Sequence, residues 1–138
     1  MDDIDRQILA SLYVNARLPL KTIAATVGLA RSSVRDRISK LEDSGVIEGY
    51  RARIKTSEGV AAILHVRLSR TPSPPAVASI VALPEVRRCY SLSGDIDLII
   101  ELAAPITSSL NDARDRIAGF PDVAEVVTAL ILNRDKDF

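Results

Sequence analysis

The first 45 residues place apolar side chains three or four positions apart in three successive stretches, which is the spacing of one helical face. Asp2, Asp3 and Asp5 fall in the first turn, where negative charge favours the helix dipole. Gly28 lies between the second and third stretches and is expected to end the second helix, because glycine accepts the left-handed conformation found at helix ends. Three short helices with a tight glycine turn before the last one predict a helix-turn-helix. The predicted helices and their apolar faces are residues 2–15 (Ile4, Ile8, Leu9, Leu12), 19–27 (Leu20, Ile23, Ala24, Val27) and 30–44 (Val34, Ile38, Leu41).

The period of the pattern changes beyond Gly45. In VIEGYRARIK, Tyr50, Ala52 and Ile54 alternate with basic residues, which predicts a strand over residues 46–55 with one basic face. The polar stretch TSEG, residues 56–59, is typical of a linker between modules. The sequence therefore predicts a winged helix-turn-helix unit over residues 1–55. Its wing carries Arg51, Arg53 and Lys55, which either touch DNA phosphate or face solvent.

The second half of the chain alternates strand and helix patterns in the order β-α-β-β-α-β, with Gly94 joining the middle two strands. This order predicts an α+β unit over residues 60–138 with the ferredoxin-like fold, in which two helices cover one face of an antiparallel sheet. The uncovered face would carry Leu, Ile and Val, so we expect it to pair with a second copy in a homodimer. The predicted elements are strands 61–70, 85–93, 95–103 and 122–132 and helices 76–83 and 106–120.

The formal net charge is zero, but the charge is unevenly distributed. Residues 1–55 hold ten Lys and Arg against seven Asp and Glu, whereas residues 56–138 hold eight against eleven. Within residues 17–55 the count is nine against four. A basic unit followed by an acidic one indicates two modules with different partners, so the zero total does not argue against a nucleic-acid partner.

The sequence also bears on where the protein works. Cys89 is the single cysteine, so no intrachain disulfide is possible, which fits a reducing compartment. The start MDDIDRQIL lacks the apolar core of a signal peptide, and no apolar run reaches membrane-spanning length. We therefore expect a cytoplasmic protein with no membrane partner.

The outward face of the third predicted helix suits double-stranded DNA. If Val34, Ile38 and Leu41 point inward, small polar side chains point outward and arginines lie on the shoulders of that face. Short side chains let the backbone approach the major groove, arginine binds guanine or phosphate, and serine donates to phosphate. The alternative is a solvated basic face on a structural helix; the three-helix pattern, the glycine turn and the local positive charge favour DNA binding. The candidate residues are Lys21, Arg31, Ser32, Ser33, Arg35, Asp36, Arg37, Ser39 and Lys40.

The stretches DDIDRQIL, IAATVGL and VRDRISKLEDSGVIEGY, in this order, resemble the N-terminal half of the leucine-responsive/asparagine regulator (Lrp/AsnC) family. The later LSGDIDLII resembles the Gly-Asp turn of that family's βαββαβ regulatory domain, the RAM-type domain. The resemblance implies a bacterial or archaeal transcription regulator that forms dimers, tetramers or octamers and binds small effectors, usually amino acids, where dimers meet. Ala30 departs from the family pattern, because a serine commonly caps the recognition helix there.

The segment LSGDIDLII interrupts an apolar strand pattern with two acids. Taken alone, it is a structural turn in which Gly94 adopts a positive φ and Asp95 bonds its own backbone. With the family resemblance it becomes a candidate effector site. Asp95 would accept hydrogen bonds from the ammonium group of an amino acid, and backbone N–H groups would donate to its carboxylate. The candidate effector-binding residues are Ser93, Gly94, Asp95 and Asp97. Asp97 either takes part in the binding or only faces solvent on the next strand.

An enzyme is disfavoured by the residues present. His65 is the single histidine and lies inside a predicted strand, and no Ser/His/Asp set, CxxC pair or glycine-rich phosphate loop occurs. We expect no cofactor and no metal. Two alternatives remain: an amino-acid-sensing assembly protein that does not bind DNA, and an enzyme like the siroheme decarboxylases, which share this two-domain layout.

Overall fold

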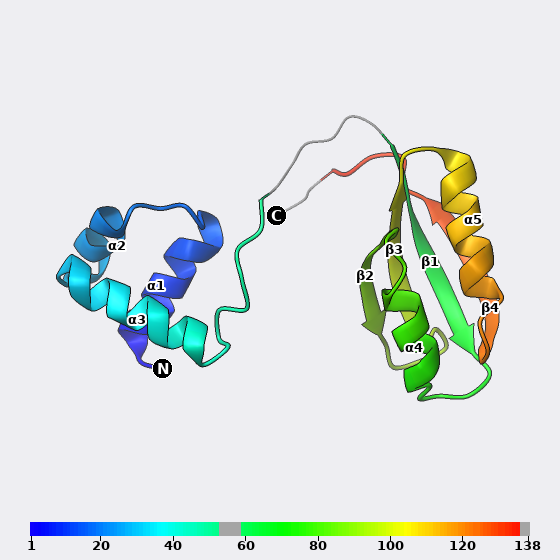
Figure 1. The fold of residues 1–138 in the computed structure, drawn as a ribbon, viewed down its shortest axis with the longest axis horizontal. Coiled ribbons are helices and arrows are strands. Elements are labelled where there is room, and N and C mark those ends of the chain that lie inside the picture. The colour runs from blue at the N-terminus through cyan, green and yellow to red at the C-terminus, as the bar shows by residue number, and fades with distance from the viewer. Residues whose placement is uncertain (53–58, 136–138) are drawn as a thin grey trace. The chain divides into compact units, whose positions relative to one another are not determined.

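The computed structural model describes residues 1–52 and 59–135, and the chain divides into two compact units, Met1–Lys55 and Thr56–Phe138 (Figure 1). The N-terminal unit contains three helices, as the helical spacing predicted. They are α1 (Asp3–Val14), α2 (Leu20–Val27) and α3 (Arg31–Asp43).

The core of the N-terminal unit is small. Its buried cluster consists of Ile8 from α1, Ile23 and Ala24 from α2, and Val34 from α3. All four belong to the apolar faces that the sequence predicted, and partly buried leucines, isoleucines and a valine surround them. Three helices of 12, 8 and 13 residues are too short to be stable alone, so their helical state depends on this packing.

The predicted strand over residues 46–55 is wrong in the part that the structure describes. Residues 46–52 form no strand, and residues 53–55 of this prediction lie outside the described residues, as do 56–58 of the predicted linker. The alternating pattern needs a neighbouring strand for its backbone hydrogen bonds. Within residues 1–52 the chain forms only helices and loops, so no partner strand is present there.

The C-terminal unit has the predicted β-α-β-β-α-β order and the ferredoxin-like topology, which confirms the α+β class. Its sheet is antiparallel with the strand order β2-β3-β1-β4, so the first strand is central. The elements are β1 (Val60–Leu68), α4 (Pro74–Val81), β2 (Val86–Ser91), β3 (Leu98–Ala104), α5 (Thr107–Ala118) and β4 (Val123–Leu130).

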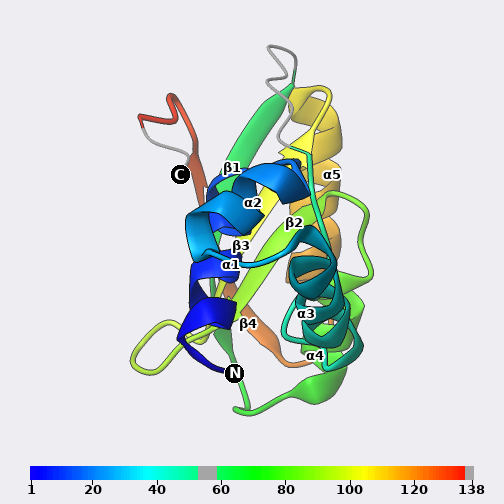
Figure 2. The same ribbon diagram turned by 90° about the vertical axis from the view of Figure 1, so that its left-hand side faces the viewer.

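Both helices of this unit cover the same face of the sheet (Figures 1 and 2). Ile80 from α4 and Ala113 and Ile117 from α5 pack in one cluster with buried residues of β1 and β3. The strand residues of this cluster are Leu64, Val66, Leu98, Ile100 and Leu102. The central strands thus alternate between core positions and positions on the other face, as a period of two requires.

The opposite side of the sheet, called here the open face, is formed by the residues that alternate with the core positions. Val127 on β4 and Tyr90 on β2 are exposed there, at 51 % and 52 %. Glu101 lies on this face but is only 9 % exposed, because Arg134 donates a hydrogen bond to it and Arg88 lies 3.8 Å away. The strand residues of the open face are Ala61, Ile63, His65, Arg67, Arg88, Tyr90, Ile99, Glu101, Ala103, Glu125, Val127 and Ala129. In the described residues no helix has the length and apolar character needed to cross a membrane.

Candidate functional site

The turn between α2 and α3 depends on a glycine. Gly28 follows the last residue of α2 with φ +69° and ψ 31°, in the left-handed region that residues with a Cβ rarely adopt. Its N–H and that of Leu29 both donate to the carbonyl of Ala24, which satisfies an otherwise unpaired end of the helix. The chain then enters α3 after two residues, as in a helix-turn-helix.

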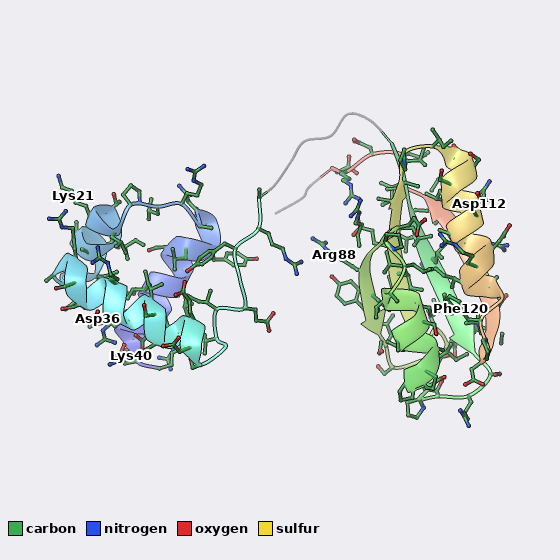
Figure 3. The ribbon with its side chains drawn as sticks, viewed as in Figure 1. Lys21, Asp36, Lys40, Arg88, Asp112 and Phe120 are labelled. Carbon is green, nitrogen blue, oxygen red and sulfur yellow. The ribbon has the colours of Figure 1, made fainter. Side chains whose placement is uncertain are left out.

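The outward face of α3 matches the prediction. Val34 and Leu41 are buried and Ile38 is partly buried, so the opposite side of the helix faces solvent. Figure 3 shows Lys21, Asp36 and Lys40 projecting from this unit. Among the described residues no acid lies within ion-pair distance of the cations Lys21, Arg31, Arg35 or Lys40. The exposed residues among the candidates are Lys21, Arg31, Ser32, Ser33, Arg35, Asp36, Ser39 and Lys40.

Arg37 differs from the other candidates. Its side chain is 30 % exposed, and its Nη1 donates to Asp2 and Asp5 at 2.7 Å each. The hydrogen bonds that Arg37 donates to Asp5, and next to Asp2, raise the pKa of its guanidinium. The sequence placed Arg37 on a shoulder of the helix, and the structure turns this shoulder toward the start of α1.

The N-terminus of α3 lacks a side-chain cap. Ala30 occupies the cap position with extended φ and ψ of −67° and 149°, and no side chain bonds to the free N–H groups of the first turn. Neither Ser32 nor Ser33 replaces the missing cap, since both lie inside the helix.

Replacing Ala30 with serine is therefore expected to stabilise the N-terminal unit by about 1 kcal/mol, because the hydroxyl would accept a hydrogen bond from a free N–H. Thermal or urea unfolding followed by circular dichroism measures the gain. Ala30→Val is the matched control, since it adds a side chain but no acceptor. Equal stability of the serine and valine variants would contradict the prediction.

The second candidate site is the turn between β2 and β3. Ser93, Gly94 and Asp95 are all exposed, and Gly94 has φ +110° with open space where a Cβ would lie. Within the described part of the chain the Asp95 carboxylate makes no hydrogen bond or ion pair. The turn thus presents an acid and exposed backbone to solvent.

Asp97 holds this turn in place. One of its oxygens accepts the N–H of Leu68 and the other accepts the hydroxyl of Thr71, both at 2.8 Å. Its own N–H donates to Val66, which ties the turn to the end of β1. These bonds begin β3 at Leu98, later than the predicted strand 95–103. The Leu68 N–H, and next the Thr71 hydroxyl, lower the pKa of the Asp97 carboxyl.

Replacing Asp97 with asparagine is expected to lower the melting temperature of the C-terminal unit at pH 7 by a few degrees, because two charge-assisted hydrogen bonds are weakened. A lowered folded-state pKa stabilises the fold above the ordinary value of 3.8 and ceases to do so as the pH falls through the depressed value. The difference between the two proteins should therefore disappear in acid below that pH.

Asp95→Asn is the matched control for this experiment. It makes the same change of charge in the same turn, but its carboxylate has no partner among the described residues. An equal fall in melting temperature for both variants would mean that charge, and not the two hydrogen bonds, stabilises the turn.

A shallow hollow of about 260 Å³ adjoins the turn on the open face. Ile96 of the turn lines it together with His65 and Arg67 of β1 and Glu125 and Val127 of β4. The Nε atom of Arg67 lies 3.6 Å from an Oε atom of Glu125, in an ion pair between the two strands. Sequence reasoning missed these strand residues, because only the register of β1 against β4 brings them beside the turn.

The single cysteine and the single histidine of the chain lie on opposite faces of the sheet. Cys89 packs against the helix-covered core, and burial raises the pKa of its thiol. His65 belongs to the open face, so it forms no Cys–His pair with Cys89.

Comparison with known proteins covers both units. Residues 1–42 match the model of the AsnC-type helix-turn-helix domain, and residues 61–138 match the Lrp/AsnC ligand binding domain. The chain is 33 % identical over 138 residues to the HTH-type transcriptional regulator LrpA of Mycobacterium tuberculosis, an alignment that covers 96 % of this chain and 91 % of that protein. The crystal structure of that LrpA superimposes with a TM-score of 0.85 over 99 % of this chain and 96 % of the other, at 29 % identity. A transcriptional regulator from Neisseria meningitidis, solved as an L-Met complex, gives 0.84 over 99 % and 93 %, at 25 % identity.

Proposed function

Because the chain belongs to the Lrp/AsnC family of transcriptional regulators, we propose that α3 binds double-stranded DNA sequence-specifically and that the C-terminal unit senses an amino acid. The observation that carries the DNA half is the outward face of α3. It combines exposed cations that have no partner in the described residues with small side chains that let the helix approach the bases.

The residues of this face have different roles in the proposal. Arg31, Arg35 and Lys40, together with Lys21 of α2, bind phosphate or guanine. The serines donate to phosphate, and Ser32 and Ser33 lie in the first turn of α3, where the helix dipole favours anions. Asp36 accepts from a cytosine amino group in the groove or repels unsuitable sequences.

The effector half of the proposal rests on the turn and the hollow beside it. Free Asp95 suits the ammonium group of an amino acid, and the exposed backbone at Ser93 and Gly94 suits its carboxylate. Asp97 contributes by holding the turn, since both of its oxygens are already occupied. The complex of the Neisseria meningitidis relative with L-Met supports this ligand class. A hollow of about 260 Å³ is small for a complete pocket, so a second chain would complete the site.

The open face of the sheet is the proposed dimer interface. It exposes Tyr90 and Val127, and its acid Glu101 is already neutralised by arginines within the same chain. A twofold axis would bring two such faces together. Tetramers or octamers would then form through contacts between dimers.

The direct test is a titration of the protein against a fluorescent duplex carrying the DNA upstream of its own gene, at two salt concentrations, with and without pooled L-amino acids. Tight, salt-sensitive binding that shifts with the pool is expected. Binding that ignores the pool at every tested concentration would overturn the effector half. Binding no tighter than to random duplex, followed by failure to enrich any sequence from a random library, would favour a sensor that does not bind DNA.

Asp95→Asn tests the effector site within the same titration. The amino-acid concentration needed for the shift is expected to rise about tenfold or more, since a charge-assisted hydrogen bond is lost. Asp112→Asn, which removes an exposed acid of α5, is the matched control and should leave the response unchanged. If the amino-acid response of the Asp95 variant were unchanged, the turn would have only a structural role.

A further inference from the structure

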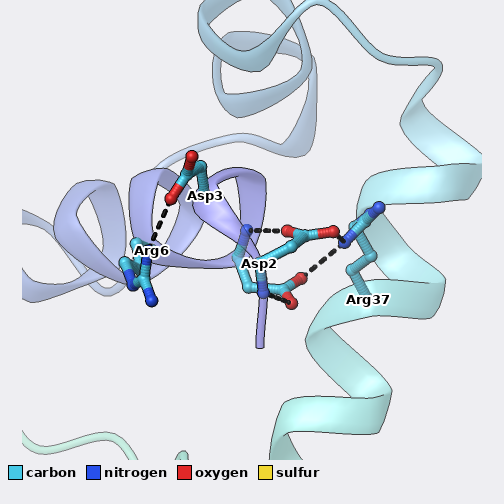
Figure 4. A network of polar contacts seen from close by, with 5 residues as sticks. Asp2, Asp3, Arg6 and Arg37 are labelled. Carbon is cyan, nitrogen blue, oxygen red and sulfur yellow. Dashed lines mark hydrogen bonds and ion pairs between the residues drawn. The ribbon is translucent and has the colours of Figure 1, made fainter.

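One polar cluster in the N-terminal unit joins the start of α1 to the middle of α3 (Figure 4). Asp2 caps α1, and it forms a capping box with Asp5: the Asp5 N–H donates to Asp2 at 2.8 Å, and the Asp2 N–H donates to Asp5 at 2.9 Å. Each carboxylate uses one oxygen for the box and the other for Arg37. All four carboxylate oxygens therefore have a donor.

This geometry is poorly suited to a phosphate contact by Arg37. Two carboxylates surround one guanidinium, so the cluster carries a net charge of −1 and repels phosphate. The capping N–H groups, and next Arg37, lower the pKa of both acids, so they are ionised at neutral pH. Asp5 is also well shielded, with a side chain only 14 % exposed.

The cluster helps to fix the rotation of α3 about its own axis, in addition to the small apolar core. On α3, Val34 and Leu41 are buried and Ile38 is partly buried, so the apolar stripe of this helix is narrow. Arg37 lies on one flank of the stripe, three residues after Val34 and four before Leu41. A bond from this flank to a fixed point on α1 selects one rotation.

We propose that Arg37 is a positioning residue, which Asp2 and Asp5 hold so that the rotation of α3 on α1 aims its outward side chains at the base edges. This inference rests on the proposed DNA binding, which it deepens by separating Arg37 from the residues that contact DNA. The acids at the start of α1 thereby take part in sequence recognition without touching DNA.

The test compares full-length variants on two duplexes, one selected from a random library by the wild-type chain and one of random sequence. The principal variant is Asp2→Asn with Asp5→Asn, because asparagine oxygens still accept the capping N–H groups but lose the charge that holds Arg37. Asp3→Asn is the matched control: Asp3 lies in the same turn, pairs with Arg6 and does not touch Arg37. All affinities are measured at a temperature where circular dichroism shows every variant folded.

The expected result runs against simple electrostatics. Removing two acids near DNA should tighten binding, yet we expect affinity for the selected duplex to fall about tenfold, which is the loss of roughly one base contact. Affinity for random duplex should stay level or rise, and the salt dependence should not change. Arg37→Gln should lower the specificity ratio similarly, and Arg37→Lys should restore part of it, since an ammonium group also pairs with the two carboxylates.

Three outcomes would overturn the inference. Tighter binding of both duplexes by the double asparagine variant, with a salt slope reduced by about 0.9 in Arg37→Gln, would show that Arg37 contacts phosphate. Lower melting temperatures with unchanged affinities would show a merely structural role. If the wild-type chain selects no sequence, the proposed function itself fails, and that result is recognisable without any variant.

Discussion

Replacing Arg31, Arg35 and Lys40 together with glutamine is expected to weaken DNA binding several hundredfold at about 0.1 M salt. Each phosphate contact contributes about 0.9 to the slope of log affinity against log salt, so three lost contacts lower the slope by about 2.7. The electrostatic term vanishes near 1 M salt, and a slope change of this size amounts to a factor of about 500 at 0.1 M. Fluorescence anisotropy over a range of salt concentrations measures both quantities.

The matched control removes the same amount of positive charge from the C-terminal unit. Arg70, Arg87 and Arg114 are arginines of the C-terminal unit, and their joint replacement with glutamine also removes three positive charges. It should leave the slope nearly unchanged. An equal loss in the control would mean that total charge, and not the face of α3, determines DNA binding, and the assignment of the interface would be wrong.

Much of the fold was predictable because local patterns report which side of an element is buried. The buried residues Ile8, Ile23 and Val34 all lie at predicted inward positions, since a helical period follows directly from the sequence. The order of elements in the second half likewise predicted the ferredoxin-like sheet, because few topologies accommodate β-α-β-β-α-β.

Features that depend on a distant partner were not predictable in the same way. The prediction of a strand over residues 46–55 is wrong in its described part. An alternating pattern indicates that a segment can form a strand, but it does not show that a neighbouring strand is present to accept its hydrogen bonds. The sequence could not show that Arg37 is paired, because its partners Asp2 and Asp5 are 35 and 32 residues away in the chain. Local charge cannot distinguish a free arginine from one that is bound to acids elsewhere in the fold.

The candidate effector site shows the same division. The sequence identified the exposed turn at Gly94, because glycine and acids in an apolar strand are a local signal. It left the role of Asp97 open, and that role follows from hydrogen bonds to Leu68 and Thr71 across the sheet. The hollow beside the turn requires the register of β1 with β4, which no local pattern supplies.

Replacing Val127 with aspartate is expected to convert the proposed dimer into monomers at micromolar concentration. The side chain is 51 % exposed in the single chain, so a carboxylate there is hydrated and the fold tolerates it. Pairing of two open faces would bury it. An uncompensated buried charge costs about 3 kcal/mol or more, and a twofold interface contains two copies, so the dimer dissociation constant should rise about 10⁴-fold.

Sedimentation velocity at several concentrations measures this change, and Val81→Asp is the matched control. Val81 is also 51 % exposed, but it lies at the end of α4, on the helix-covered side of the sheet. The control should remain dimeric. If the Val127 variant were dimeric and the Val81 variant monomeric, the interface would lie on the helix-covered side of the sheet and not on the open face.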